Sequence, residues 1–136
     1  MSKIRVLVVD DYKLVRQGIR ECLERADDIT VVGEAVNGEQ GLELVEVLEP
    51  DVTVLDIRMP VMNGVDAARA IRSIAPQVRI MVLSAFEEEA RLKTLLDLGV
   101  SAVLLKTCEI GELQEAVRAV ARGEMYIQSN LEFAGI

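Results

Sequence analysis

The stretch IRVLVVDD, residues 4–11, is a short apolar run that ends on two aspartates. Its β-branched, almost continuous apolar residues predict a strand that is buried on both faces, as in parallel sheets. The aspartates follow the strand directly. Side chains at this position lie at the carboxyl edge of an open parallel sheet, where ligands bind in such folds. The stretch therefore predicts a fold class and also the edge of the sheet that carries a site.

Four further apolar segments repeat the pattern along the chain, and amphipathic helical spacing separates them. The predicted strands are residues 4–9, 30–35, 52–55, 79–83 and 102–105. The predicted helices are residues 14–26, 42–48, 64–75, 87–98 and 110–121. Alternating strands and helices, joined by right-handed crossovers, predict a doubly wound α/β fold with a five-stranded parallel sheet and five helices. Residues 1–123 form the predicted domain, and residues 124–136 are expected to be a tail or the start of a linker.

Composition excludes several classes of function. The chain has 136 residues, of which 51% are hydrophobic and 28% charged, so a disordered tail is excluded. No apolar run approaches the roughly 18 residues of a membrane span, and the N-terminus does not resemble a signal peptide. A formal charge of −8 without a basic cluster argues against DNA binding by this segment. The absence of histidine excludes imidazole catalysis. We expect a cytoplasmic domain.

Five polar residues end or follow the predicted strands: Asp10, Asp11, Asp56, Ser84 and Lys106. Carboxylates that lie together repel each other unless a cation neutralises them, and a cluster with oxygen ligands alone favours Mg²⁺. A carboxylate, a hard cation, a lysine and a hydroxyl around one point suit a transferring phosphoryl group. One aspartate can attack phosphorus and become an aspartyl phosphate.

Each of these residues also has a structural interpretation when it is taken alone. The two aspartates after the first strand can cap a helix, and Asp56 or Lys106 can be a solvated strand end. Ser84 can be an ordinary loop residue. Their joint placement after strands one, three, four and five favours the phosphoryl site.

The chain resembles the receiver domain of two-component response regulators from residue 3 to about residue 123. The residues that carry this resemblance are VVDD at 8–11, LDIRMP at 55–60, Gly64, LSA at 83–85 and LLK at 104–106. The motifs RMP at 58–60 and GEMY at 123–126 are most similar to the NarL/FixJ subfamily, whose members are transcription factors with a helix-turn-helix domain after the receiver. The resemblance implies a flavodoxin-like strand order, 2-1-3-4-5.

The resemblance also implies a role for each site residue. Asp56 is the implied phosphoacceptor. The implied Mg²⁺ ligands are Asp10, Asp11, Asp56 and the main-chain carbonyl of Arg58. Ser84 is the implied switch hydroxyl, and Lys106 is the implied phosphate-pairing cation. The implied partner is a sensor histidine kinase, with homodimerisation as a further option. Contact with DNA is expected only through an output domain outside this chain, and no membrane contact is expected. The implied chemistry is self-catalysed phosphoryl acceptance and slow hydrolysis of the aspartyl phosphate, without enzymatic turnover of a substrate.

Two positions differ from the usual receiver pattern. Val103 stands where an aromatic residue is common, and Thr107 stands where a proline in a cis peptide is common. A non-proline cis peptide costs about 3–4 kcal/mol. Since valine has one stiff torsion and no ring, we expect residues 84–98, including Phe86, to carry the response to phosphorylation.

Three alternatives remain beside a transcription-regulating receiver. The first is a stand-alone receiver in a phosphorelay. The second is an aspartyl-phosphate phosphatase or phosphomutase, but these enzymes need a second aspartate where this chain has Arg58, and a cap region. The third is a flavin-binding module, in which Asp10, Asp11 and the following Tyr12 would repel the flavin phosphate.

Overall fold

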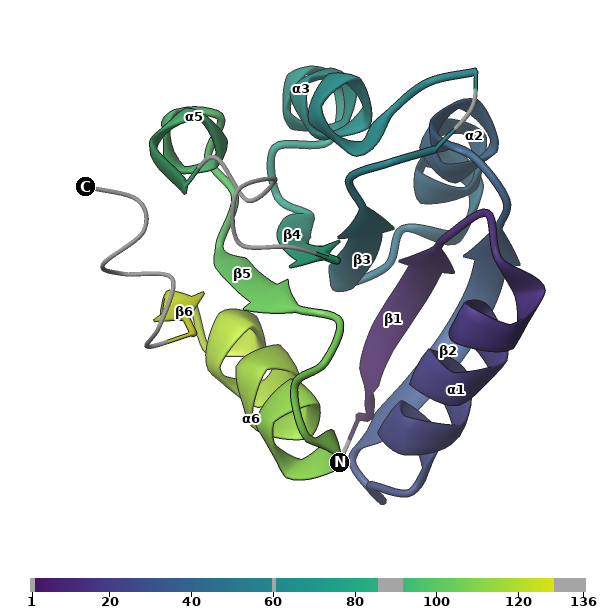
Figure 1. Ribbon diagram of the computed structural model, residues 1–136, viewed down its shortest axis with the longest axis vertical. Helices are drawn as coiled ribbons and strands as arrows, with labels where there is room; N and C mark the ends of the chain where they lie inside the picture. The colour runs from purple at the N-terminus through teal and green to yellow at the C-terminus, as the bar shows by residue number, and fades with distance from the viewer. Residues whose placement is uncertain (1, 60, 86–91, 129–136) are drawn as a thin grey trace.

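A parallel sheet runs through the centre of the molecule, with helices on both faces (Figure 1). The computed structural model describes residues 2–59, 61–85 and 92–128. The strands are β1 (Ile4–Val9), β2 (Ile29–Ala35), β3 (Val52–Asp56), β4 (Arg79–Ser84), β5 (Ala102–Leu105) and β6 (Tyr126–Ile127). They lie in the order β2-β1-β3-β4-β5-β6, and each neighbouring pair is parallel.

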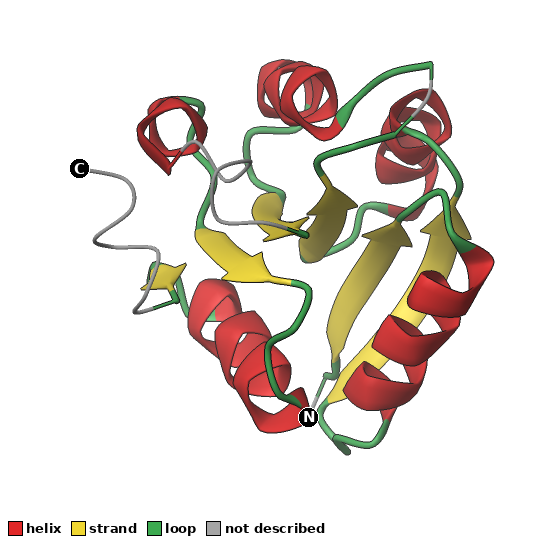
Figure 2. Ribbon diagram, in the orientation of Figure 1, coloured by secondary structure: helices red, strands yellow, loops and turns green. Residues whose placement is uncertain are grey.

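The described helices form one layer on each face of the sheet. They are α1 (Lys13–Glu24), α2 (Gly38–Leu48), α3 (Gly64–Ile74), α5 (Leu92–Asp97) and α6 (Ile110–Ala121). Helices α1 and α6 cover one face, and α2, α3 and α5 cover the other (Figure 2). The helix predicted at 87–98 is described only from Leu92 onward, since residues 86–91 lie outside the described part of the chain. None of the described helices has the length and apolar character needed to span a bilayer.

The apolar runs of the strands are explained by two separate cores. In β1, Val6 and Val8 pack into the cluster under α1 and α6, whereas Leu7 and Val9 pack into the cluster under α2, α3 and α5. Successive side chains of a strand point to opposite faces, so a strand covered on both faces needs apolar residues at every position. The doubly wound α/β class predicted from the sequence is confirmed.

The predicted number of strands was wrong, because the structure has a sixth strand after α6. The backbone N–H of Tyr126 donates to the Ser101 carbonyl (2.9 Å), and that of Gln128 donates to the Val103 carbonyl (3.1 Å). The Gln128 side chain also accepts from the N–H of Leu105 at 2.7 Å. Two residues are too few for a periodic pattern, so their pairing with the edge of β5 left no signal in the sequence.

A close approach of two backbone segments shapes the loop after β3. The N–H of Gly64, the first residue of α3, donates to the Ile57 carbonyl at 2.8 Å. A Cβ atom at Gly64 would overlap the carbonyl oxygen of Asp56 and lie 2.8 Å from the Cα of Ile57. Only glycine fits this contact without moving the end of β3. The position of Asp56 therefore depends on Gly64.

We expect Gly64→Ala to lower the free energy of unfolding by about 3 kcal/mol, because the new methyl group displaces backbone that cannot yield cheaply. Gly18→Ala is the matched control, since Gly18 lies inside α1 with nothing within 4 Å of an added Cβ. It should stabilise the protein by about 0.5–1 kcal/mol through its higher helix propensity. Urea unfolding of both variants measures the difference, and equal stability of Gly64→Ala and the unaltered protein would contradict the expected overlap.

Candidate functional site

The polar residues that follow the central strands meet at one edge of the sheet, as the sequence predicted. Asp10 comes directly after β1, Asp56 and Ser84 are the last residues of β3 and β4, and Lys106 comes directly after β5. These four strands are consecutive neighbours in the sheet. Because they are parallel, their carboxyl ends lie side by side.

Lys106 joins two of the carboxylates. Its Nζ atom lies 3.0 Å from Asp10 Oδ2 and 3.0 Å from Asp56 Oδ1. Its backbone N–H donates to the Ser84 carbonyl at 2.7 Å, which anchors the residue to β4. The described backbone contains no cis peptide bond, so the bond between Lys106 and Thr107 is trans. Burial lowers the pKa of Lys106, but the carboxylates of Asp10 and Asp56 outweigh this effect and hold the pKa above its usual value.

Asp56 is a buried acid whose proton affinity is raised. Burial of this side chain, which is 6% exposed, raises its pKa to about 6, against an ordinary value of 3.8. The charge of Asp10 acts in the same direction, whereas Lys106 and a hydrogen bond from the Arg58 backbone oppose it. The ionised form of Asp56 is therefore costly unless a further positive charge is present.

Asp10, Asp11 and Asp56 offer carboxylate oxygens that all lie within 4.8 Å of one another. Asp11 Oδ1 is buried and has no hydrogen-bond partner among the described residues. Lys106 pairs with two of these three carboxylates, and the repulsion among the carboxylates favours a further positive charge between them. Oxygen ligands of this kind fit a hard divalent cation such as Mg²⁺. The residues thus fit the metal that the sequence suggested.

The other two predicted site residues lie at the same edge. Ser84 is fully buried at the end of β4. Arg58 lies in the exposed loop two residues after Asp56. The switch role of the Ser84 hydroxyl and the metal-ligand role of the Arg58 carbonyl stay predictions.

We expect Asp11→Asn to weaken Mg²⁺ binding by at least about tenfold while the metal-free protein keeps or gains stability. The substitution removes a ligand charge, but it also relieves repulsion with the two neighbouring aspartates. Calorimetric titration with MgCl₂ and urea unfolding in EDTA measure the two effects. Asp27→Asn, at an exposed position, is the control. A large loss of stability in EDTA would show that Asp11 is mainly structural.

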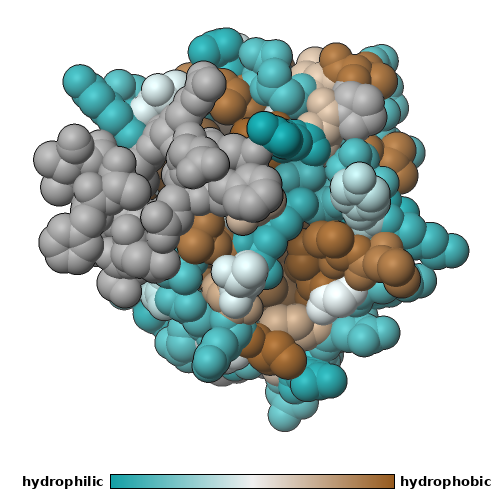
Figure 3. All heavy atoms as spheres, viewed as in Figure 1, coloured by the Kyte–Doolittle hydropathy of each residue, from teal (hydrophilic) through white to brown (hydrophobic). Residues whose placement is uncertain are grey.

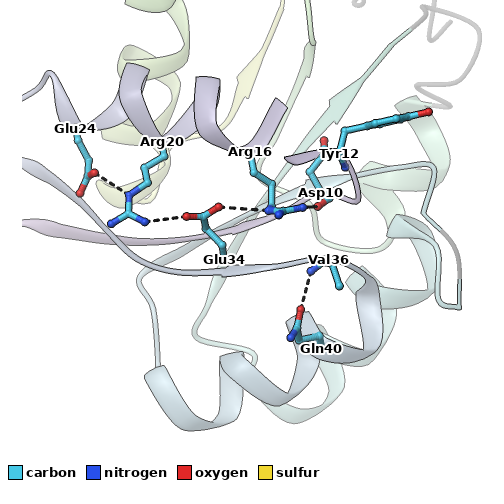
Figure 4. A network of polar contacts seen from close by, with 8 residues as sticks. All are labelled: Asp10, Tyr12, Arg16, Arg20, Glu24, Glu34, Val36 and Gln40. Carbon is cyan, nitrogen blue, oxygen red and sulfur yellow. Dashed lines mark hydrogen bonds and ion pairs between the residues drawn. The ribbon is translucent and has the colours of Figure 1, made fainter. Parts of the chain in front are cut away.

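Three contacts at the site had no signal in the sequence. Arg16, on α1, donates from Nη1 to the main-chain carbonyl of Asp10 at 2.9 Å and from Nε to Glu34 Oε1 at 3.3 Å (Figure 4). The backbone N–H of Tyr12 donates to Asp10 Oδ1 at 2.8 Å. A charged residue on the polar face of an amphipathic helix looks like any solvated residue, so sequence reasoning did not single out Arg16.

An apolar groove lies beside the site, between α1 and the beginning of α6. Apolar residues gather on the surface between these two helices in Figure 3. The cavity of about 300 Å³ is lined on its apolar sides by Val15, Ile19, Ile110 and Leu113, and Lys106 lies at its wall. The groove therefore connects an apolar surface with the cation of the site.

Comparisons with known proteins agree with this geometry. The sequence model of the family described as the response regulator receiver domain matches residues 6–118. The nitrate/nitrite response regulator protein NarL of Escherichia coli strain K12 is 41% identical over 126 residues, which cover 93% of this chain and 58% of NarL. The transcriptional regulatory protein LiaR of Bacillus subtilis is 36% identical over 128 residues, which cover 94% of this chain and 61% of LiaR.

A solved structure gives the same result. The signal receiver domain of the response regulator NarL from Mycobacterium tuberculosis superimposes with a TM-score of 0.87 at 39% identity, over 91% of this chain and 100% of that domain. The chain spans about six-tenths of the length of the NarL and LiaR proteins that it matches. The resemblance to NarL-like receivers stated from the motifs is confirmed. This chain belongs to the family of response regulator receiver domains.

Proposed function

We propose that Asp56 accepts a phosphoryl group from a sensor histidine kinase, with Mg²⁺ held at the acidic cluster. The observation that carries this proposal is the Lys106 ammonium group, 3.0 Å from both Asp10 and Asp56, beside a buried Asp11 oxygen without a hydrogen-bond partner among the described residues. This arrangement places positive charge beside one acceptor carboxylate and leaves further oxygens for a cation.

In the transfer step, a carboxylate oxygen of Asp56 attacks phosphorus and forms a new P–O bond. The P–N bond to the kinase histidine breaks, and its electron pair stays on the imidazole nitrogen, which then takes up a proton. Lys106 stands where it can bind an equatorial phosphoryl oxygen. Asp10, Asp11, Asp56 and the Arg58 carbonyl would hold Mg²⁺, which would supply positive charge to offset the charge of the phosphoryl group. The domain thus catalyses its own phosphorylation and slow dephosphorylation.

The groove between α1 and α6 is the surface that we assign to the kinase. Its apolar residues suit a helix of the partner, and Lys106 at its wall leads to the acceptor. A partner docked there would hold its phosphohistidine close to Asp56. The exchange would take place in the cytoplasm, where we place this domain.

The match covers 58% of NarL and 61% of LiaR, and the greater length of these proteins supports an output domain that follows the receiver. Since β6 makes Tyr126–Ile127 part of the receiver sheet, we propose that the residues after β6 lead to a DNA-binding domain whose dimerisation the receiver controls, and that the whole protein regulates transcription. A solved structure of two RcsB dimers bound to two parallel DNAs is 26% identical to this chain and superimposes with a TM-score of 0.89, which supports this proposal. The expected response of residues 84–98 to phosphorylation lies in part outside the described residues, which omit 86–91.

Phosphoryl donors test the proposal directly. Incubation of the chain with acetyl phosphate or phosphoramidate and Mg²⁺ should add one phosphoryl group per molecule, detected by intact-mass spectrometry. EDTA should prevent the addition. A protein that stays unmodified with both donors, while it binds Mg²⁺, would refute the assignment of the site.

The 136-residue chain should show no salt-sensitive binding to duplex DNA, because its formal charge is −8 and its sequence has no basic cluster. Fluorescence anisotropy with labelled duplexes at low and high salt measures this. Sequence-specific binding by this chain alone would contradict the division between receiver and output domain.

A further inference from the structure

Arg16 connects the acidic loop to the body of the fold. The Asp10–Tyr12 segment joins β1 to α1 and carries two of the three clustered carboxylates. Arg16 lies one helical turn further along, and its side chain is 13% exposed. Its guanidinium group reaches back over this turn and donates from Nη1 to the Asp10 carbonyl at 2.9 Å. The contact is therefore made to the backbone that places the carboxylates.

Among the residues that the structure describes, the other hydrogen bonds of the acidic loop are made by groups other than the Asp10 carbonyl. The N–H of Asp10 donates to the Ala35 carbonyl at 3.1 Å, and the N–H of Tyr12 donates to Asp10 Oδ1 at 2.8 Å. The first contact continues the pairing of β1 with β2, and the second orients one carboxylate. The hydrogen bond from Arg16 is the third of these contacts, and it restrains the peptide plane between Asp10 and Asp11.

Glu34 on β2 holds the Arg16 side chain in place. Its Oε1 lies 3.3 Å from Arg16 Nε, and its Oε2 lies 2.8 Å from Nη1 of Arg20. Arg20 in turn contacts Glu24 Oε1 at 3.0 Å, so the network runs along α1 and β2 from the acidic loop to the surface (Figure 4). Two donors of one guanidinium group thus serve Asp10 and Glu34 at once, in a planar and rigid arrangement that the point charge of a lysine on its flexible stem holds less firmly.

We infer that Arg16 is a positioning residue for the metal site, which holds the Asp10 and Asp11 carboxylates in binding geometry through the Asp10 carbonyl, with Glu34 as its anchor. The inference rests on the metal site of the proposed function. Charge alone works in the opposite direction, because a guanidinium group next to the cluster repels a divalent cation. The change in Mg²⁺ affinity when Arg16 is removed therefore distinguishes the two roles. Binding weakens if Arg16 positions the carboxylates, and it tightens if Arg16 acts by its charge alone.

The test uses Arg16→Met, which keeps most of the aliphatic stem and removes the donors. Arg118→Met is the matched control, since Arg118 makes similar ion pairs with Asp28 and Glu115 away from the site. Calorimetric titration with MgCl₂, at a temperature where each protein is folded, gives the dissociation constant. We expect about tenfold weaker binding for Arg16→Met and no change for Arg118→Met. Unchanged or tighter binding by Arg16→Met would overturn the inference.

Two further measurements test the route of the effect. Glu34→Ala should weaken Mg²⁺ binding in the unaltered protein but not in the Arg16→Met background, because Glu34 acts through Arg16. Additive losses would show that Glu34 acts by its charge alone and overturn its role as an anchor. If Arg16→Met does not fold, Arg16→Lys replaces it, and we expect an intermediate affinity; an affinity equal to that of the unaltered protein would count against the inference.

A readout without metal separates this inference from the proposed function. In EDTA, amide hydrogen exchange at Tyr12 should be faster in Arg16→Met than in Arg118→Met, since the loop loses its anchor. Equal exchange rates would overturn the positioning role. If the unaltered chain binds no Mg²⁺ at all, the metal site falls and the inference falls with it. If it binds Mg²⁺ normally and Arg16→Met does too, only the inference falls.

Discussion

Asp56→Asn should incorporate no phosphoryl group from acetyl phosphate under conditions that label the unaltered chain fully. An amide oxygen is a poor nucleophile and cannot form the mixed anhydride, although its size and position match those of the carboxylate. Intact-mass spectrometry after a timed incubation measures the loss. Asp66→Asn, at an exposed position on α3, is the control and should be labelled like the unaltered chain.

The neighbouring aspartates are alternative acceptors, so this prediction also tests which aspartate is phosphorylated. Oxygens of Asp10 and Asp11 lie within 4.8 Å of an Asp56 oxygen, so a misassigned acceptor would reveal itself by persistent labelling. Peptide mapping would then locate the phosphoryl group. Full labelling of Asp56→Asn at either residue would contradict the assignment.

Asp56→Asn should also be more stable than the unaltered protein above pH 6 in EDTA, by at most about 3 kcal/mol. Burial raises the pKa of Asp56 to about 6 in the folded state, from an ordinary value of 3.8. Between these pH values the folded state binds more protons than the unfolded state. The contribution of Asp56 to stability is therefore complete at low pH and is lost as the pH rises through about 6.

Urea unfolding at a series of pH values from 4 to 8 measures this difference. Asparagine does not ionise, so the advantage of the variant should grow with pH and level off above 6. Addition of Mg²⁺ should reverse the order, because the cation stabilises the form that binds it better. A variant that is less stable than the unaltered protein at pH 7.5 in EDTA would show that the ion pair with Lys106 outweighs the cost of burial.

The site was largely predictable because its residues follow strands that the sequence marks clearly. The carboxyl ends of parallel strands lie at one edge of a sheet, so the positions of Asp10, Asp56, Ser84 and Lys106 after their strands were enough to predict that these residues lie together. The properties that depend on distance were not predictable. The double ion pair of Lys106 and the raised pKa of Asp56 arise from burial and from charges that are 46 residues or more apart in the chain.

The sequence by itself determined the three-layer α/β architecture and the edge that carries the chemistry, because apolar periodicity and strand-end residues are local properties. Only the tertiary structure decided the contacts that one segment makes with another. The pairing of β6 with β5, the overlap that excludes a side chain at Gly64, and the bond from Arg16 to the Asp10 carbonyl all belong to this class. Their physical reason is shared: each depends on the distance and direction between backbone groups, which residue identity alone does not specify.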